Sequence, residues 1–526
     1  MNAIIMAAGM SSRFAPLSYE KPKGLLVVKG EVLIERQIRQ LQEAGITDIT
    51  VVVGYMKEQF FYLEDKFGVK LVVNEDYYRY NNTSTLIRVL DKIDETYICS
   101  SDNYFSENVF MERPKYAYYA ANYADGETNE WCLDVAENDV IRKVTIGGSQ
   151  SWYMIGHVYF DHAFSEKFRK ILKDEYARSA ECRESLWENL YMKHLDVLKM
   201  KIKRYPEGVI HEFDSLDELR AFDPLYINDA DSVIMRNICH YLKCEQKDIC
   251  NCFSMISGMT NNSFGFLYRK NGLKYVYRKP GIGTETYIDR KSEWFSMQYA
   301  KKLGLDESFV YMDENEGWKL SLYIEDARWM DYHKWDEVER ALGMMRKLHE
   351  SKIVSKYDFG LWNKALNYLE KLGEYGREEY SDMAQIHEQM IALWDRLSKE
   401  GVRYVLCHCD GVDRNFLIDK NDKMYLIDWE YSGNDDPALD VTTFICCSDY
   451  TDEEADRVIR LYFGHEPTHD EWRHQYAYLA IGSWHWFLWA LYSKKSAIDV
   501  GNYPSLYYNM AKNYYLKTMN LYNLYH

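Results

Sequence analysis

The sequence predicts two parts: an α/β unit with a mostly parallel sheet, then an α+β unit. Three observations carry this prediction. A chain of 526 residues is too long for one ordinary hydrophobic core. The first part alternates short apolar runs with helical stripes. The later part has a few strand-like runs, long stretches of helical periodicity, and a polar motif between two strand-like runs.

The elements of the first part alternate between strand and helix. In Val32–Ala44, the stripe of Leu33, Ile38 and Leu41 ends before Gly45, which is typical of a helix and its stop. The order implies parallel strands with right-handed crossovers, with ligands beyond the carboxyl ends of the strands. The expected strands are Ala3–Ala7, Ile49–Val53, Val69–Val73 and Tyr97–Ser100, and the expected helices are Val32–Ala44, Met56–Lys66 and Thr83–Lys92.

Two features lie at that carboxyl edge. The small residues of Ala7–Ser12 let backbone N–H groups approach phosphates, and Arg13 and Lys23 add positive charge. The second feature is Asp102, directly after the last strand, where a carboxylate suits magnesium. Together they predict a nucleotide site.

Four short sequence strings of the first part resemble those of a known enzyme family, and the resemblance covers about residues 1–225. A-A-G-x-x-S-R-F from Ala7, P-K-G-L-L from Pro22, S-D-N-Y from Ser101 and E-F-D-S from Glu212 resemble the nucleotidyltransferases of sugar phosphates and choline phosphate. Within that group the sequence is similar to the bacterial CTP:phosphocholine cytidylyltransferases. The resemblance implies a Rossmann-like nucleotidyltransferase fold. It also implies attack by a substrate phosphate on the α-phosphorus of CTP, with pyrophosphate leaving.

The resemblance also implies site residues. Asp102 and Asp214 would hold Mg²⁺, Lys23 and Arg13 would meet the triphosphate, and the nucleotide would contact Ala8, Gly9 and Asn82. Asp214 also begins a helix with Ser215, so a capping role stays open beside the metal role. Trp131 and Trp187 are candidates for a trimethylammonium group, with ordinary packing as the alternative.

The polar motif of the later part is His408-x-Asp410-x-x-x-x-Asn415, followed by Asp428-Trp429-Glu430. Strand-like runs precede both elements, at Tyr404–Leu406 and Met424–Ile427. Phosphoryl transfer from ATP needs one carboxylate to take the proton of the acceptor hydroxyl, and an Asn and a second carboxylate to hold magnesium. The spacing is close to the H-R-D-x-x-x-x-N and D-F-G pair of protein kinases.

The rest of the later part fits a small-molecule kinase. A linker near Asn228 places the domain boundary between residues 227 and 228, with lobes of about 228–325 and 326–526. A Gly/Ser/Thr turn between strands, such as Ser257–Asn261, lets backbone N–H groups cover ATP phosphates. The expected elements are a helix at Ser232–Lys243, strands at Gly265–Arg269, Lys274–Arg278 and Leu320–Ile324, and helices at Trp335–Glu350, Trp362–Leu372 and Ser381–Lys399.

With the S-G-M-T-N string from Ser257 and R-K-P-G-x-G-T from Arg278, the motif resembles the choline/ethanolamine kinase group of the aminoglycoside-phosphotransferase-like kinases. The similarity covers about residues 230–526, and Arg replaces the usual lysine at position 278. It implies a bilobal protein-kinase-like fold. The implied roles are Asp410 as base, Asn415 and Asp428 on Mg²⁺, Ser257, Thr260 and Arg278 at the ATP phosphates, Glu293 supporting Arg278, and Glu325 at the adenine hinge.

The acceptor is predicted from Trp486 and Trp489, which lie three residues apart and share a helix face. In choline kinases a similar pair forms part of the choline cage, and Tyr503 or Tyr508 would add a wall. A buried aromatic helix is the alternative for this pair. Ethanolamine, which would need hydrogen-bond acceptors, stays open as a substrate.

Composition limits the partners. A net charge of −18 argues against nonspecific binding to nucleic acid or anionic membranes, and we expect a cytoplasmic protein of open oligomeric state. The joint expectation is ATP-dependent phosphorylation of choline, then CTP-dependent formation of CDP-choline, with Mg²⁺ in both sites. The alternatives are ethanolamine or a phosphonate analogue, a sugar-phosphate nucleotidyltransferase joined to a sugar or antibiotic kinase, and a noncatalytic choline-binding protein.

Overall fold

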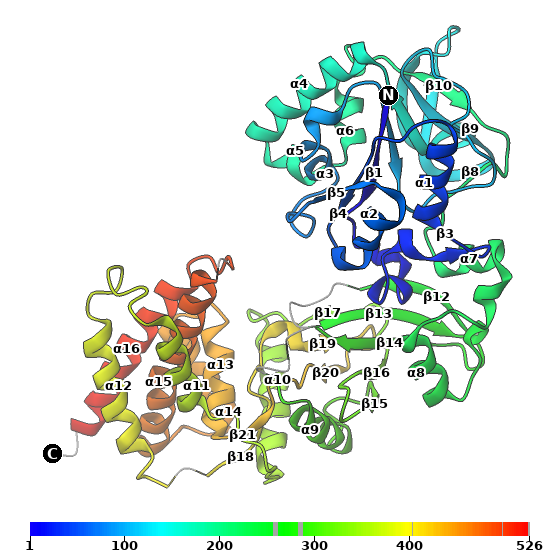
Figure 1. The fold of residues 1–526 in the computed structure, drawn as a ribbon. Helices are drawn as coiled ribbons and strands as arrows, with labels where there is room; N and C mark the ends of the chain where they lie inside the picture. Colours follow the sequence, from blue (N-terminus) through cyan, green and yellow to red (C-terminus); the bar gives the residue numbers. More distant parts are fainter. Residues whose placement is uncertain (256–260, 282–283, 285–287, 402, 497, 524–526) are drawn as a thin grey trace. The chain divides into compact units, whose positions relative to one another are not determined.

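The computed structural model describes the chain except residues 256–260, 282–283, 285–287, 402, 497 and 524–526. The chain forms two compact units, coloured along the sequence in Figure 1. The first comprises Met1–Ile256 and Ser263–Lys274, and the second comprises Ser257–Asn262 and Tyr275–His526. The boundary predicted at 227/228 follows the sequence motifs rather than the limits of the two compact units. It stays a proposal about the catalytic parts.

A seven-stranded sheet forms the centre of the first unit, with the order β10-β8-β9-β6-β1-β4-β5. The four strands β5, β4, β1 and β6 run parallel, and β9 pairs antiparallel with β6 and β8. The strands are β1 (Asn2–Ala7), β4 (Ile49–Val53), β5 (Lys70–Val73), β6 (Thr96–Ser100), β8 (Tyr118–Val135), β9 (Ile141–Phe160) and β10 (Lys201–Arg204).

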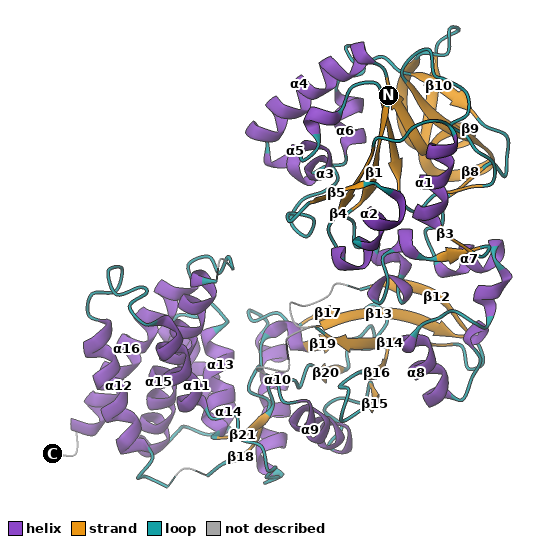
Figure 2. Ribbon diagram, viewed as in Figure 1, coloured by secondary structure: helices purple, strands orange, loops and turns teal. Residues whose placement is uncertain are grey.

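Both faces of this sheet are covered, which explains the continuous apolar runs of its parallel strands. Alternate residues serve opposite faces: Ile5 joins the cluster with α1 and α2, and Ile4 joins the cluster with α3 to α6. Figure 2 shows these two helical layers. The helices are α1 (Leu33–Glu43), α2 (Tyr62–Phe67), α3 (Thr83–Ile87), α4 (His162–Arg178), α5 (Ala180–Glu184), α6 (Trp187–Lys193) and α7 (Leu216–Phe222).

Shorter elements complete the first unit. Two short antiparallel pairs also form, β2 with β3 and β7 with β11. Their bounds, with the elements that follow α7, are β2 (Val27–Val28), β3 (Glu31–Val32), β7 (Tyr104–Phe105), β11 (Ile210–His211), α8 (Val233–Leu242), β12 (Ile249–Ser254) and β13 (Asn261–Tyr268).

Most of β14 (Leu273–Pro280) belongs to the second unit, where it pairs antiparallel with β16 (Lys319–Leu322); β16 also pairs with β15 (Phe309–Met312). Helix α9 (Arg290–Lys302) lies between β14 and β15 in the sequence. The remainder is mainly helical around one large core. It contains β17 (Arg328–Trp329), α10 (Trp335–Glu350), α11 (Leu361–Leu372), α12 (Met383–Leu397), β18 (Val405–Cys407), β19 (Phe416–Ile418), β20 (Met424–Leu426), β21 (Gly433–Asp435), α13 (Pro437–Cys446), α14 (Asp452–Phe463), α15 (His469–Lys495) and α16 (Tyr503–Asn523).

The predicted fold class is confirmed in both parts. Among the described residues no helix is long and apolar enough to cross a membrane. Two local expectations differ in length: the helices expected at Met56–Lys66 and Thr83–Lys92 are each divided between a short α-helix and a 3₁₀ turn. The long hairpin of β8 and β9 has no counterpart in the prediction, since its strands carry many polar residues.

Candidate active sites

The first site lies at the carboxyl edge of the parallel strands. Ala8 and Gly9 follow β1, and Asp102 follows β6, its parallel neighbour. Gly24 lets the Lys23 turn approach the end of β6, because a Cβ on Gly24 would lie 2.8 Å from the Ser101 Oγ. The strand order therefore brings together residues that are about ninety positions apart.

Opposite charges pair in this site. The Lys23 Nζ lies 2.8 Å from an Asp102 carboxylate oxygen, and an Arg13 guanidinium nitrogen lies 3.2 Å from one of Asp214. Burial lowers the pKa of Lys23, but nearby carboxylates, Asp102 foremost, raise it more, so its net pKa lies above 10.5. The predicted metal carboxylates and triphosphate cations thus lie together.

Glu212 is a third acid of this site that the sequence reasoning missed. The Asn103 amide donates to its carboxylate at 3.3 Å. Burial raises the pKa of Glu212, and the negative charges of Asp102 and Asp214 raise it further. The positive charge of Lys23 opposes this rise. Carboxylate oxygens are the donors that Mg²⁺ prefers, so the residue types present fit this ion. The available signal was the position of Glu212 two residues before Asp214.

A cavity of about 440 Å³ adjoins the loop after β1 and is lined by Ala8, Gly9 and Asn82, among others. The Asn82 carboxamide oxygen accepts from the backbone N–H of Trp187 at 2.6 Å, and its amide donates to Glu188 at 3.2 Å. Asn82 therefore links the cavity to the start of α6. Burial raises the pKa of Glu188 to about 7.

The two predicted aromatic residues of the first site lie in different environments. Trp187 is 1% exposed and stacks on Tyr119, with ring centroids 5.8 Å apart. Trp131 lies on β8, partly buried against the same core cluster. Of these two tryptophans, only Trp131 is partly exposed to solvent. Trp187 therefore supports the site through packing.

The second site is built on the loop between β18 and β19. The Asn415 amide donates to an Asp410 carboxylate oxygen at 3.0 Å, leaving the Asn415 carbonyl oxygen for a metal. The His408 ring bonds the backbone oxygen of Ile427 at 2.9 Å and so joins this loop to the end of β20. Asp428 follows with a left-handed φ of 66°.

A buried carboxylate fixes the backbone of the Asp410 loop. Asp440 on α13 accepts from the N–H groups of His408 and Cys409 at 2.8 and 2.6 Å. The His349 ring bonds Asp440 at 2.9 Å and the Tyr462 hydroxyl at 2.8 Å. His349, Cys407 and Asp440 offer ligand atoms within 4.8 Å of one another, but these bonds account for His349 and Asp440 without a metal. His349 therefore has a structural role.

The charged residues near Asp428 form a network. Arg278 contacts Asp428 at 2.6 Å and Glu430 at 2.9 Å. Glu293 does not support Arg278 by a direct ion pair, since its carboxylate contacts Lys319 and Arg290, each at 2.7 Å. Lys319 was not predicted; it lies opposite Arg278 in the β14–β16 register, which the sequence does not show.

The two acids of this site differ in protonation. Burial raises the pKa of Asp410 to about 7, and the Asp428 carboxylate contributes to the rise. Burial also raises the pKa of Asp428, but Arg278 outweighs it and brings the value to about 2. Pairs of acids pushed apart in this way take different chemical roles: Asp410 suits a base, and Asp428 a permanently ionised metal ligand.

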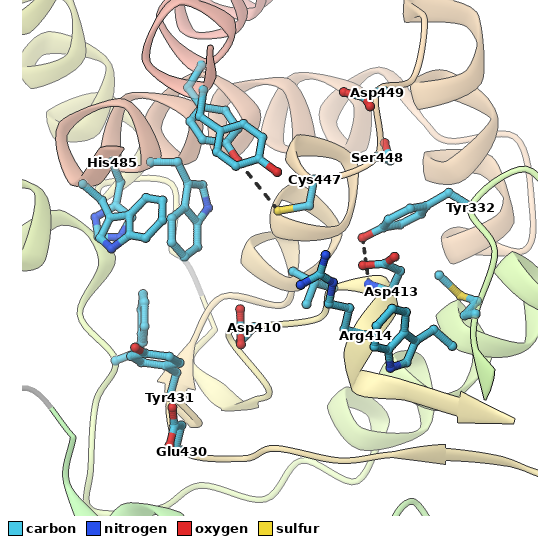
Figure 3. Close-up of a pocket in the computed structure, with 18 of the residues that line it drawn as sticks. Tyr332, Asp410, Asp413, Arg414, Glu430, Tyr431, Cys447, Ser448, Asp449 and His485 are labelled. Atoms are coloured by element: carbon cyan, nitrogen blue, oxygen red, sulfur yellow. Dashed lines mark hydrogen bonds between the residues drawn. The ribbon is translucent and has the colours of Figure 1, made fainter. Parts of the chain in front are cut away.

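A cavity of about 890 Å³ opens on Asp410. Figure 3 shows Asp410 facing its interior, with Tyr431 and Glu430 on one side and Asp413 and Arg414 on the other. The rings of Trp486 and Trp489 line it with centroids 5.8 Å apart.

Other predicted residues of the second part lie elsewhere. Tyr508 is outside the lining residues and donates to Asp382 at 2.6 Å, whereas Tyr503 and Tyr507 line the cavity. The reason is helical phase, since residues four apart share a face. Glu325 is exposed, with Lys420 4.0 Å away. Ser257 and Thr260 lie outside the described residues.

Two family comparisons match the chain in separate parts. Residues 3–111 match the MobA-like NTP transferase domain, and residues 336–474 match the phosphotransferase enzyme family.

Two relatives of the first part are cytidylyltransferases. A 2-aminoethylphosphonate cytidylyltransferase of Lancefieldella rimae is 36% identical over 43% of this chain and 93% of its own length. A choline-phosphate cytidylyltransferase of Streptococcus pneumoniae is 33% identical over 44% of this chain and 100% of its own length.

Relatives of the second part include the protein LicA of Haemophilus influenzae, 26% identical over 47% of this chain and 94% of its own length. The solved choline kinase LicA of Streptococcus pneumoniae is 25% identical, covers 54% of this chain and 98% of that structure, and has a TM-score of 0.45.

Proposed function

Because the chain belongs through its first part to the cytidylyltransferase family of these relatives, and joins that domain to a phosphotransferase domain, we propose that it makes CDP-choline in two steps. The second part would phosphorylate choline with ATP, and the first would transfer the cytidylyl group of CTP to phosphocholine. We keep 1–227 and 228–526 as the two catalytic parts.

The observation that carries the choline assignment is the aromatic cavity around Asp410. Trp486 and Trp489 line the same cavity as a carboxyl group whose pKa is about 7. Aromatic faces attract a quaternary ammonium, and the choline hydroxyl lies two carbons from that group. A substrate held by the rings therefore presents its hydroxyl near Asp410.

In the kinase step, Asp410 accepts the proton of the choline hydroxyl as its oxygen attacks the γ-phosphorus of ATP. The bond between this phosphorus and the bridging oxygen breaks, and ADP leaves. Asn415 and Asp428 would hold Mg²⁺, which neutralises phosphate charge. Arg278 would exchange Asp428 for the phosphates of ATP.

In the transferase step, a phosphate oxygen of phosphocholine attacks the α-phosphorus of CTP, and pyrophosphate leaves. Lys23 and Arg13 would stabilise the charge that moves onto the leaving oxygens. Asp102, Asp214 and Glu212 offer the carboxylate oxygens for Mg²⁺. No protein nucleophile is needed.

A second candidate acceptor is 2-aminoethylphosphonate, favoured by the 36% identical relative. This compound already carries its phosphorus through a carbon bond and has no hydroxyl to phosphorylate. The joined phosphotransferase domain therefore favours an alcohol precursor, choline or ethanolamine.

The test is product identification by mass. The protein is incubated with ATP, CTP, Mg²⁺ and either choline or ethanolamine, and separately with CTP and 2-aminoethylphosphonate. We expect CDP-choline as the main product. CDP-ethanolamine alone, or product from the phosphonate alone, would refute the choline assignment.

A further inference from the structure

A lysine lines the proposed choline cavity. Lys364 lies in the first turns of α11, and its ammonium lies over the Phe359 ring, 4.7 Å from the centroid. The ring of His485 lies 6.1 Å from that of Phe359 and 5.0 Å from that of Trp486. Lys364 thus belongs to the same aromatic wall as the tryptophan pair.

Lys364 has no neutralising partner there. Among the described residues its side chain forms no ion pair or hydrogen bond. The start of α11 offers partial positive charge, which disfavours a nearby cation. Burial lowers the pKa of Lys364 below 10.5, and the Cys409 thiol is the group that opposes this. The same lysine helps to lower the pKa of His485 to about 3, so that ring is neutral.

A quaternary ammonium in this cavity would share it with the lysine. Choline keeps its charge at every pH, whereas Lys364 loses its charge as the pH rises through its pKa. Two unit charges about 10 Å apart, at an effective dielectric constant of about 20, change an affinity on the order of tenfold.

Resting on the proposed choline kinase function, we propose that Lys364 is a specificity-determining residue whose neutral form admits choline, so that choline binding is linked to release of a proton. The charge of the lysine sets the direction in which choline affinity changes with pH. At low pH the charged lysine weakens choline binding, and at high pH the neutral amine does not.

Other groups of the cavity also titrate or carry charge. From the elements around Lys364 these are Cys409, Asp410, Glu430, Tyr431, Cys447, Tyr368, His485, Tyr503 and Tyr507, with Asp331, Tyr332, His333, Asp413, Arg414 and Asp449 farther along the lining. Asp410 would strengthen choline binding as it ionises. Binding is therefore measured with Asp410→Asn in every protein, and the remaining groups are common to all of them.

The experiment compares three proteins in that background: Lys364 retained, Lys364→Met and Lys364→Arg. Choline affinity is measured by calorimetry from about pH 7 to about pH 10, in buffers of different ionisation enthalpy. With Lys364 retained we expect affinity to rise on the order of tenfold with pH, and a proton to be released on binding. Lys364→Met should bind tightly at every pH, and Lys364→Arg weakly at every pH, both without this proton release.

The ligand control is 3,3-dimethylbutan-1-ol, the uncharged carbon isostere of choline. Its affinity should be the same in the three proteins, because it carries no charge for Lys364 to repel. Thermal unfolding confirms that each variant is folded. Equal pH profiles in the three proteins, or the same pH shift with the uncharged isostere, would overturn the role of Lys364. Failure of choline to bind any of them would instead refute the choline function, and the inference with it.

Discussion

At the scale of single residues, the two sites share one charge arrangement. Each cation expected on nucleotide phosphates contacts a carboxylate expected on magnesium. The pairs are Lys23 with Asp102, Arg13 with Asp214, and Arg278 with Asp428. We propose that binding of a metal nucleotide exchanges both partners: the phosphates would take the cations, and the metal would take the carboxylates.

Metal removal tests this exchange. Without Mg²⁺ the carboxylates keep their cations, so CTP affinity should fall at least about tenfold, which corresponds to about 1.4 kcal/mol. Calorimetric titration with CTP, with and without Mg²⁺, measures this. Lys23→Met should reduce the difference because Asp102 is then already free of its partner. A CTP affinity that is independent of Mg²⁺ would contradict the exchange.

The proton acceptor gives a second test at this scale. Asp410→Asn should lower choline phosphorylation by about a hundredfold or more, the usual range for a general base. In the unchanged chain the rate should rise with pH through about 7, because Asp410 must be ionised to accept the proton. The variant should lose this inflection, and Asp422→Asn on an exposed turn should keep it. An Asp410→Asn enzyme with the full rate would exclude Asp410 as the base.

At the scale of elements, periodicity predicted most helices and strands well. Trp335–Glu350 was predicted to the residue, and the parallel strands agree within two residues. The β8–β9 hairpin was missed because its strands carry many polar residues and their pairing is interrupted by register shifts. The order of the elements could therefore be predicted from the sequence, whereas the long irregular strands could not.

The contact between α10, α13 and the catalytic loop makes an element-scale prediction. His349→Gln removes one partner of the buried Asp440 carboxylate, so the free energy of unfolding should fall by about 3 kcal/mol. Because Asp440 still accepts from two backbone N–H groups, we expect a lower kcat with little change in KM. Chemical denaturation and steady-state kinetics measure both, with the exposed His465→Gln as control. An unchanged kcat would show that His349 does not position the loop.

At the scale of the whole molecule, two sets of predicted site residues lie on one chain. Each set is contained in its own unit: Lys23, Asp102 and Asp214 in the first, and Asp410, Asn415 and Asp428 in the second. The proposed reactions share phosphocholine, which would pass from one site to the other as a free intermediate.

Mixing two inactive proteins tests this sharing. Asp410→Asn lacks the first step and Lys23→Met lacks the second, so neither alone should make CDP-choline from choline, ATP and CTP. Together they should, because phosphocholine released by one protein is a substrate for the other. Product identification by mass gives the answer. If the mixture makes no product although Asp410→Asn accepts added phosphocholine, the intermediate is not released.

The sequence alone determined the order of the elements and the two-part chemistry, and it predicted most of the charged residues proposed for the sites, because periodicity and motif spacing are local properties. The tertiary structure decided which side chains meet. Lys319 rather than Arg278 contacts Glu293, and Tyr507 rather than Tyr508 faces the cavity. Likewise, only the tertiary structure places Glu212 near Asp102 and Asp214, and Lys364 in the lining of the second cavity. Strand register, helix phase and burial set these contacts, and all three depend on packing between residues far apart in the chain.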